Sequence, residues 1–281
     1  MAGSVSSDLL AAVVGRLSAQ DYELLPLPEA VAELLVLARS PQVNFADLER
    51  VVARDPALAA HVLRAASSSV FAAGQTTTIR EAILRIGSKQ LIRIALSVRL
   101  ASLYEVSRYE GLCRRIWAHA RLTGVYAATL APRWSIDTEE AFLAGLLHTV
   151  GKPALLRLIE VEARALSVLA PRQLVKEWLQ EWHVRVGVEV ARSWDFPEQV
   201  VTAIHHYRST PPPGPYASMA VVVGVSSELA ELGTASEAEL RDRLGELSLV
   251  GALDLEVEAL LAWLDLEKLR QQAQAMGMRE E

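Results

Sequence analysis

FLAGLLHTVGKPAL, residues 142–155, places a histidine at the end of an apolar helical run and follows it closely with a glycine and a lysine. A histidine in such a position is typical of the metal-binding turn of a hydrolase, where the metal activates a water molecule. The neighbour of His148, however, is Thr149. A threonine hydroxyl stays neutral near neutral pH and cannot replace a carboxylate that balances and bridges divalent cations. The stretch therefore has the outline of a metal site without its acidic member.

Four more histidines lie on other predicted helices, and facing helices can bring such residues together in the core of a bundle. Any single histidine is more often a hydrogen-bonded core or surface residue than a metal ligand. We therefore predict a degenerate pocket that holds neither a metal nor a cofactor and contains no catalytic residue. Its predicted members are His119, His148, Thr149, Lys152, His183, His205 and His206.

Helix-capping signals recur along the chain and strand signals do not. Residues 28–40 have apolar side chains at helical spacing, Asn44 and Asp55 stand at N-cap positions, and Thr78 with Glu81 has capping-box spacing. Gly87 fits a tight turn between two helices, where a side chain would crowd. Residues 221–225, VVVGV, could form a short strand, but their neighbours favour a helix. Further helices are predicted at 88–104, 112–131, 139–148, 173–183, 184–194 and 197–207, which makes the fold all-α.

The composition is that of a globular protein long enough to bury a core. Of 281 residues, 51% are hydrophobic and 22% charged. No uninterrupted apolar run reaches the roughly 18 residues of a membrane span, and the first residues lack a cationic signal sequence. We therefore expect a cytoplasmic protein without a membrane partner. The lone Cys113 excludes an internal disulfide and is expected to be a buried small hydrophobic residue.

Charge is distributed unevenly along the sequence. The net charge of −6 argues against a general nucleic-acid binder, which usually needs surplus cations. Residues 80–121 nevertheless carry nine Arg and Lys against three Glu, whereas residues 228–281 carry thirteen acidic residues against five basic ones. This asymmetry suits docking of the two segments or a charged partner surface, although solvated helix faces are the more common explanation.

Two helix faces are candidates for an interaction surface. One is cationic and could contact an acidic protein or a phosphate group, and the other carries two tryptophans four residues apart that would form a partner hot spot if exposed. Solvated cations and buried, helix-packing tryptophans are the ordinary alternatives. The candidate residues are Arg85, Lys89, Arg93, Arg99, Trp178 and Trp182.

The order and spacing of several stretches resemble a known family. A histidine, then H-x-x-G-K about thirty residues later, then another histidine and an HH pair are similar to the HD superfamily of metal-dependent phosphohydrolases, including the HD-GYP phosphodiesterases. In those enzymes an Asp beside the second histidine bridges metals, at the position of Thr149 here. The residues after His206 contain no GYP-type segment.

The upstream half narrows this resemblance to the HDOD domain, the HD-related output domain of bacterial signalling proteins. The resemblance covers about residues 22–210. It implies an all-α, multi-helix HDOD bundle with an HD-like helical core, in a family generally regarded as non-enzymatic. The matching stretches are LPLPEAVAELLVLARSP (25–41), FADLERVVARDPALAAHVLRAASSSVF (45–71), TIREAILRIGSKQLIRIAL (78–96), FLAGLLHTVGKPAL (142–155) and WDFPEQVVTAIHHY (194–207).

The predicted organisation follows from this resemblance. Residues 1–21 would form an N-terminal helical leader, and residues 22–210 the HDOD domain, divided at 110 and 111 into an N-terminal helical subdomain and a degenerate HD-like subdomain. Residues 211–281 would form a Pro-rich linker and an acidic, helical C-terminal extension.

The resemblance implies a non-catalytic regulatory module that contacts kinase, receiver or cyclic-di-GMP-related domains on another chain. Self-association is compatible with the sequence. Two alternatives stay open: a metal-dependent phosphohydrolase or phosphodiesterase of HD type, and a nucleotide-binding or nucleic-acid-binding regulator that uses the cations of residues 80–121.

Overall fold

A computed structural model of the protein describes residues 2–40, 44–68, 75–210, 212–232, 237–246 and 256–276. Within these ranges all regular secondary structure is helical, as the sequence predicts. Residue 211 of the Pro-rich linker and the segments 233–236, 247–255 and 277–281 of the acidic extension lie outside the described residues.

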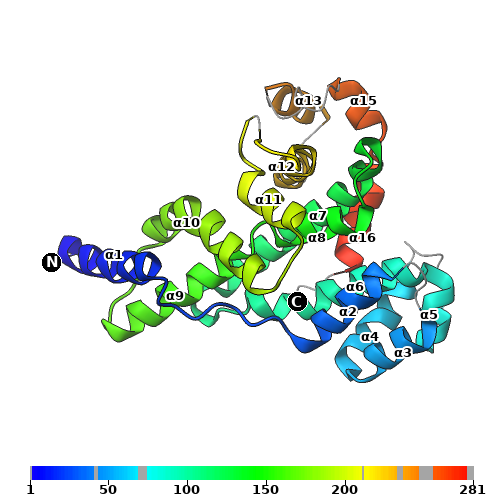
Figure 1. The fold of residues 1–281 in the computed structure, drawn as a ribbon, viewed down its shortest axis with the longest axis horizontal. Coiled ribbons are helices and arrows are strands. Elements are labelled where there is room, and N and C mark those ends of the chain that lie inside the picture. Colours follow the sequence, from blue (N-terminus) through cyan, green and yellow to red (C-terminus); the bar gives the residue numbers. More distant parts are fainter. Residues whose placement is uncertain are drawn as a thin grey trace.

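The N-terminal lobe consists of α2 (Glu29–Arg39), α3 (Phe45–Ala53), α4 (Pro56–Ala66), α5 (Ile79–Ile86) and α6 (Ser88–Ala101). The predicted caps are present. Asn44 accepts from the backbone N–H of Ala46, Asp55 accepts from two backbone N–H groups, and Thr78 with Glu81 forms a capping box. Both α2 and α4 pack on α6 (Figure 1). The buried side chains of these helices belong to one hydrophobic core that continues into the C-terminal helices.

Gly87 separates α5 from α6 for a different reason than the sequence suggested. Its φ of +81° lies in the region that L side chains avoid, and no atom lies within 4 Å of the position that a Cβ would take. Backbone conformation, rather than crowding, therefore requires glycine at this turn.

The C-terminal lobe consists of α7 (Glu110–Leu130), α8 (Thr138–Leu147), α9 (Gly151–Ala165), α10 (Arg172–Ser193), α11 (Glu198–His206) and α12 (Ala217–Leu232). Helix α7 packs on α8 and α12, and α9 packs on α10. The close approach of α9 to α10 depends on Gly151, because a Cβ there would lie 1.9 Å from the carbonyl oxygen of His183. Residues 221–225 belong to α12 and are helical, as their neighbours predict.

Helix α10 corrects one sequence expectation. Residues 173–183 and 184–194 were predicted as two helices, but they form one helix from Arg172 to Ser193. No glycine or proline stands at the expected junction, and the buried Leu179, His183 and Val186 continue one inward face across it. The helix therefore carries His183 near its middle rather than at an end.

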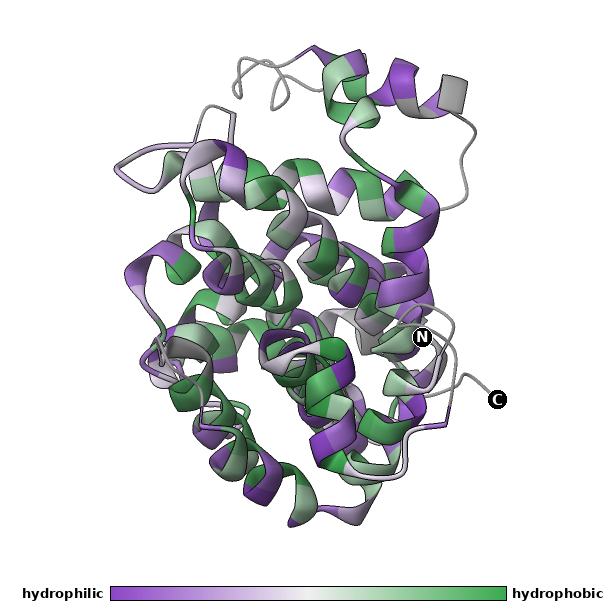
Figure 2. Ribbon diagram, turned by 90° about the vertical axis from the view of Figure 1, so that its right-hand side faces the viewer, coloured by the Kyte–Doolittle hydropathy of each residue, from purple (hydrophilic) through white to green (hydrophobic). Residues whose placement is uncertain are grey.

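Residues 138–165 are long and apolar enough to cross a bilayer by length and composition, but 89% of the apolar 18-residue window within them is buried inside the protein. They form α8 and α9, the central helices of the C-terminal lobe, and their burial indicates core helices. Figure 2 shows hydrophobic and hydrophilic positions alternating along most helices, as expected of amphipathic helices around a shared core.

Helices outside these two lobes lie at the two ends of the chain. Helix α1 (Ala2–Ala19) packs on α9 at one end of the molecule (Figure 1). After α12 the chain forms α13 (Glu237–Glu246), α15 (Val257–Ala262) and α16 (Leu266–Ala275), and α16 returns along α7. Both ends are therefore tied to the C-terminal lobe.

Candidate functional site

The centre of the predicted pocket is a cluster of two histidines and a serine. His119 from the middle of α7 and His148 from the end of α8 have their Nε2 atoms 3.2 Å apart. The hydroxyl of Ser227 on α12 lies 3.2 Å from the first of these nitrogens and 3.4 Å from the second. Two consecutive α-helices and a third, distant in sequence, thus supply one hydrogen-bonded cluster.

The hydrogen-bond partners define the tautomers of the two imidazoles. His148 Nδ1 lies 2.6 Å from the carbonyl oxygen of Gly145, which can only accept, so Nδ1–H donates. In a neutral imidazole Nε2 is then an acceptor, and His119 Nε2–H donates to it. Burial lowers the pKa of His119 to about 4 and that of His148 well below its usual value, and nearby positive charges act in the same direction. Both rings are therefore neutral at pH 7.

His183 from α10 is paired with a tyrosine. Its Nε2 lies 2.8 Å from the hydroxyl of Tyr207, and the Tyr207 ring stands edge-on to His148 with ring centroids 4.9 Å apart. Burial lowers the pKa of His183 to about 3 and raises that of Tyr207 to about 12. Tyr207 thus contacts both His183 and His148, and burial keeps His183 and Tyr207 neutral.

These residues do not fit a hydrolytic metal centre. Two imidazole nitrogens converge, which is too few for a site that normally takes three or more protein ligands including carboxylates. Among the described residues no group of three His, Cys, Asp or Glu side chains is arranged to hold a metal ion. Thr149 is fully buried, and its hydroxyl neighbours that of Tyr104. Thr149, at the position where the resemblance to the HD superfamily implies a bridging Asp, carries no charge.

His205 and His206 do not join this cluster. His205 is exposed and its ring lies against that of His206, whose Nδ1 is 3.2 Å from the Ser209 hydroxyl. The inward face of α11 carries Val200, Ala203 and Ile204, and helical periodicity brings Tyr207 onto that face next. The inner position that the sequence assigned to the HH pair therefore belongs to Tyr207.

A cavity of about 870 Å³ opens beside the cluster, between α7, α12, the first turn of α9 and residues 207–208 after α11. His119, Tyr207 and Ser227 form part of its wall. The charged groups at its wall are Arg114, Arg115, Lys152, Arg208 and Glu231. Burial and the charge of Arg208 lower the pKa of Lys152 to about 8, against a smaller opposing effect of Glu231. Cations therefore outnumber the single carboxylate on this wall.

Comparison with known proteins identifies the family. A family model described as the HDOD domain matches residues 24–210. The chain belongs to the HDOD family. An uncharacterized protein of Treponema pallidum (strain Nichols) is 24% identical over 196 residues, which are 66% of this chain and 37% of that protein. The chain thus spans well under half the length of this relative.

Solved structures share the HDOD fold over nearly the whole chain. An HDOD domain protein of unknown function from Geobacter sulfurreducens is 20% identical with a TM-score of 0.71, covering 98% of this chain and 100% of that one. A Shewanella amazonensis SB2B protein, provisionally named a metal-dependent phosphohydrolase, gives the same identity, TM-score and coverage. A Marinobacter aquaeolei VT8 protein, provisionally named a signal transduction protein, is 22% identical with a TM-score of 0.64, covering 98% of this chain and 66% of that one. At these identities the likeness establishes the fold.

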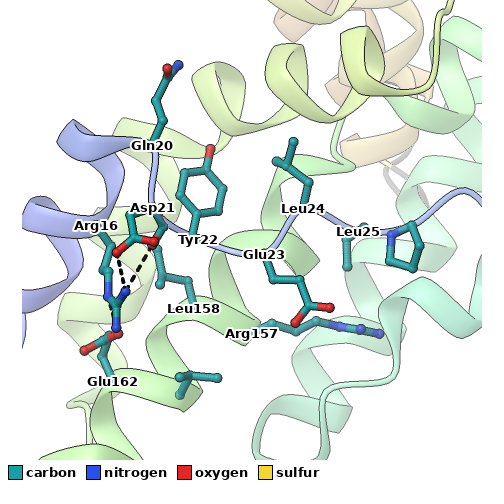
Figure 3. A pocket seen from close by; sticks show the side chains of 12 residues that line it. Arg16, Gln20, Asp21, Tyr22, Glu23, Leu24, Leu25, Arg157, Leu158 and Glu162 are labelled. Carbon is teal, nitrogen blue, oxygen red and sulfur yellow. Dashed lines mark hydrogen bonds and ion pairs between the residues drawn. The ribbon is translucent and has the colours of Figure 1, made fainter.

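The HDOD chain has a second cavity of about 370 Å³ between residues 20–26 and α9 (Figure 3). Its charged side chains largely neutralise one another. Arg16 donates to Asp21 at 2.5 Å and to Glu162 at 3.1 Å, and the Tyr22 hydroxyl donates to Glu189 nearby. The contacts hold the N-terminal segment against α9 and α10, so this cavity is better explained by packing than by a ligand.

Most residues of the cationic candidate surface form ion pairs or hydrogen bonds within the protein. Arg93 donates two hydrogen bonds of 2.9 Å to Glu139, and Arg99 pairs with Asp55 at 2.5 Å. Arg85 lies within 3.5 Å of the backbone carbonyls of Ala66 and Gln75. Lys89 keeps 71% of its side chain exposed. Arg85 is also exposed, so the structure leaves Arg85 and Lys89 at the surface, whereas Arg93 and Arg99 form ion pairs within the fold.

The two tryptophans of the second candidate surface also differ in exposure. Trp178 is 4% exposed, whereas Trp182 is half-buried, and their ring centroids lie 5.9 Å apart. The pair therefore packs as a unit with Trp178 in the core, and an exposed two-tryptophan hot spot is not formed.

Sequence reasoning missed Tyr207 and Ser227. Neither residue type is a usual metal ligand, and Ser227 lies beyond the region that the HDOD family model matches. The signal for Tyr207 was its place on the inward face of α11. For Ser227 the available hint was the apolar run of residues 219–225, since a serine on such a helix must find a hydrogen-bond partner.

Proposed function

We propose that this HDOD protein is a non-catalytic, cytoplasmic regulatory module that relays a signal through a protein partner. The direct hydrogen bond between His119 and His148 carries the proposal. In an HD-type hydrolase these nitrogens would face a metal, whereas here one donates to the other and Ser227 lies within reach of both. With Thr149 in the acidic position, the pocket keeps its helical architecture and lacks the charge that binds divalent cations.

The partner class rests on the family resemblance. We propose a kinase, receiver or cyclic-di-GMP-related domain on another chain, in line with the Marinobacter protein that is provisionally named for signal transduction. Self-association through an apolar helical face remains compatible with this role.

Elemental analysis of tag-free protein, combined with hydrolysis of bis(4-nitrophenyl) phosphate in the presence of Mn²⁺ or Fe²⁺, tests the non-catalytic role. We expect no stoichiometric metal and no turnover in the wild type. Near-stoichiometric metal with turnover that His148→Ala abolishes would overturn the proposal. Thr149→Asp is the matched variant, and a gain of metal in this variant alone would identify the lost carboxylate as the missing ligand.

A second candidate function is the binding of a small phosphate-containing ligand, and the cavity wall favours it. Arg114, Arg115, Lys152 and Arg208 face one cavity with Glu231 as the opposing carboxylate. Like charges held together in a partly desolvated cavity repel one another, and an anion would relieve that repulsion. Arg114 is also paired with Glu110, so Lys152 and Arg208 are the cations most directly available.

Calorimetric titration with AMP and with inorganic phosphate tests this second candidate. We expect Lys152→Met to weaken binding about tenfold, the usual effect of losing one charge-assisted contact. Arg164→Met, a change on the exposed face of α9, is the charge-matched control and should leave binding unchanged. Equal binding by the two variants, or none by the wild type at low salt, would remove this function.

A further inference from the structure

The C-terminal helix α16 joins the two lobes through the backbone of its last turn. A guanidinium N–H of Arg121, on α7, donates to the carbonyl oxygen of Ala273 at 2.9 Å. His61 of α4 has its Nε2 3.2 Å from the carbonyl oxygen of Ala275, and because a carbonyl only accepts, His61 must donate. Figure 1 shows α16 running beside α7 toward the N-terminal lobe. One helix end is thus held by both lobes.

The residues that contact the end of α16 have the chemistry that recognises a helix C-terminus. The last four carbonyls of an α-helix lack intrahelical partners and carry partial negative charge, which donors and cations stabilise. Arg121 is 7% exposed and His61 is 4% exposed, so both donors are buried at the point of contact. Tyr126 of α7 is fully buried beside Arg270 of α16. We call His61, Arg121 and Tyr126 the α16 seat.

The apolar part of the contact is small. Helix α16 buries Leu269 and Ala273, with Met276 directly after it, at helical spacing. Trp263, ahead of α16, remains 37% exposed with its ring 3.6 Å from the Arg133 guanidinium carbon. By contrast, α12 buries eleven residues in the C-terminal lobe. A ten-residue helix is marginal alone in water, so α16 depends on this limited contact and can leave it more readily than α12.

We propose that the α16 seat is a docking site for the C-terminal end of an amphipathic helix, that α16 occupies it in cis, and that a protein partner binds by displacing α16. The displacing helix must bury apolar residues spaced like Leu269, Ala273 and Met276. It must also bring carbonyl oxygens to Arg121 and His61, because losing an acceptor at a buried guanidinium is unfavourable by several kcal/mol.

This inference rests on the partner-binding role proposed above and names its surface. Its test uses the chain's own segment as the probe. If the peptide does not bind the α16 seat, a partner can still bind another face of the protein. If the protein has no regulatory partner, the peptide can still bind the α16 seat.

Hydrogen exchange of the wild-type chain is the first experiment, because it needs no variant. We expect the amides of α16 to exchange at least about tenfold faster than those of α7, reporting a local opening that leaves the bundle folded. Exchange of both helices in one common event would make α16 a permanent part of the bundle and overturn the proposal.

Peptide capture is the second experiment. A fluorescent peptide of residues 256–276 is titrated into the full chain and into Leu269→Asp, whose own helix is weakened. We expect Leu269→Asp to bind about tenfold more tightly than the wild type, since its cis competitor is lost. Gln271→Asp adds the same charge at an exposed position of α16 and should behave like the wild type.

Recognition by the seat is checked from the peptide side, which leaves the protein fold untouched. A peptide carrying Ala273→Asp should lose at least about tenfold in affinity for Leu269→Asp protein. No binding of the native peptide to a folded Leu269→Asp chain would overturn the proposal. A wild-type dimer that Leu269→Asp converts to a monomer would also overturn it, because α16 would then occupy a second copy rather than its own chain.

Discussion

His119 and His148 hydrogen-bond to each other through Nε2 atoms 3.2 Å apart, within a cluster that Ser227 completes. Because His148 donates through Nδ1 to Gly145, the bond between the two rings has a defined direction, from His119 to His148. His148 must stay neutral for its Nε2 to accept, and burial disfavours the charged form of both rings. The cluster is therefore expected to be sensitive to acid.

Acid should destabilise the protein through these histidines. The pKa of His119 is lowered to about 4 and that of His183 to about 3, both mainly by burial, so the unfolded chain takes up these protons at higher pH than the folded one. Their contribution to stability is complete above about pH 6.5 and is lost as the pH falls toward 4 and then 3. Urea denaturation followed by tryptophan fluorescence between pH 4 and 7 measures this slope.

His119→Gln provides the control for acid sensitivity, because its side-chain amide can still donate to His148 but does not titrate. The free energy of unfolding of this variant should depend less steeply on pH, by up to one proton. Identical slopes for the variant and the wild type would contradict the assigned lowering of the His119 pKa.

Replacing Gly151 with alanine should strongly destabilise the C-terminal lobe. The added Cβ would lie 1.9 Å from the His183 carbonyl oxygen and 2.5 Å from the Gly187 nitrogen, so two helix backbones would have to separate. We expect a loss of about 3 kcal/mol or more in the free energy of unfolding. Gly15→Ala on α1, where no atom lies within 4 Å, should instead stabilise by roughly 0.5–1 kcal/mol. Chemical denaturation of both variants makes the comparison, and similar effects would contradict the close approach.

The sequence predicted the fold well because the governing interactions are local. Caps at Asn44, Asp55 and Thr78 are set by neighbouring residues, and the apolar spacing of each helix reveals its inward face. The sequence does not predict the continuity of α10. The two predicted helices were separated at Val184 because different motifs lie on either side of it, although no helix-breaking residue stands there.

The site was less predictable because it depends on contacts between distant helices. Residue type alone identified His119, His148 and His183 as members of the site. It also selected His205 and His206, but these two residues lie on the side of α11 that faces away from the cluster. Nothing local in the sequence pairs Arg93 with Glu139, 46 residues away, or brings Ser227 to His148, 79 residues away. Such pairings follow from how the helices pack.

The Arg93–Glu139 pair should contribute to the free energy of unfolding, whereas the neighbouring Lys89 should not. Arg93 forms a two-pronged hydrogen-bonded pair between α6 and α8 in which both side chains are largely buried. We expect Arg93→Met, which keeps the apolar stem, to lower the free energy of unfolding by about 2 kcal/mol. Lys89→Met should change it by less than about 0.5 kcal/mol, because its side chain is exposed and lies 4.0 Å from Glu139. Equal losses in urea denaturation would contradict this division.

Ligand binding in the cationic cavity should weaken as the pH rises through about 8. The pKa of Lys152 is lowered to about 8 by burial and by Arg208, so the free lysine loses its proton in this range. Bound phosphate would hold the proton on the lysine, and affinity should fall by up to about tenfold for each pH unit above the free pKa. AMP is a suitable probe because its phosphate, with a second pKa of about 6, keeps a constant charge from pH 7.5 upward.

Lys152→Arg distinguishes this effect from a general influence of pH, because a guanidinium stays charged throughout the range. Titrations at pH 7.5 and 9.5 should show a marked loss of AMP affinity for the wild type and a nearly flat response for Lys152→Arg. If both proteins lose affinity equally, a group other than Lys152 controls binding. If Lys152→Arg binds no AMP at either pH while remaining folded, the site requires the shape of lysine, and its recognition of phosphate depends on more than charge.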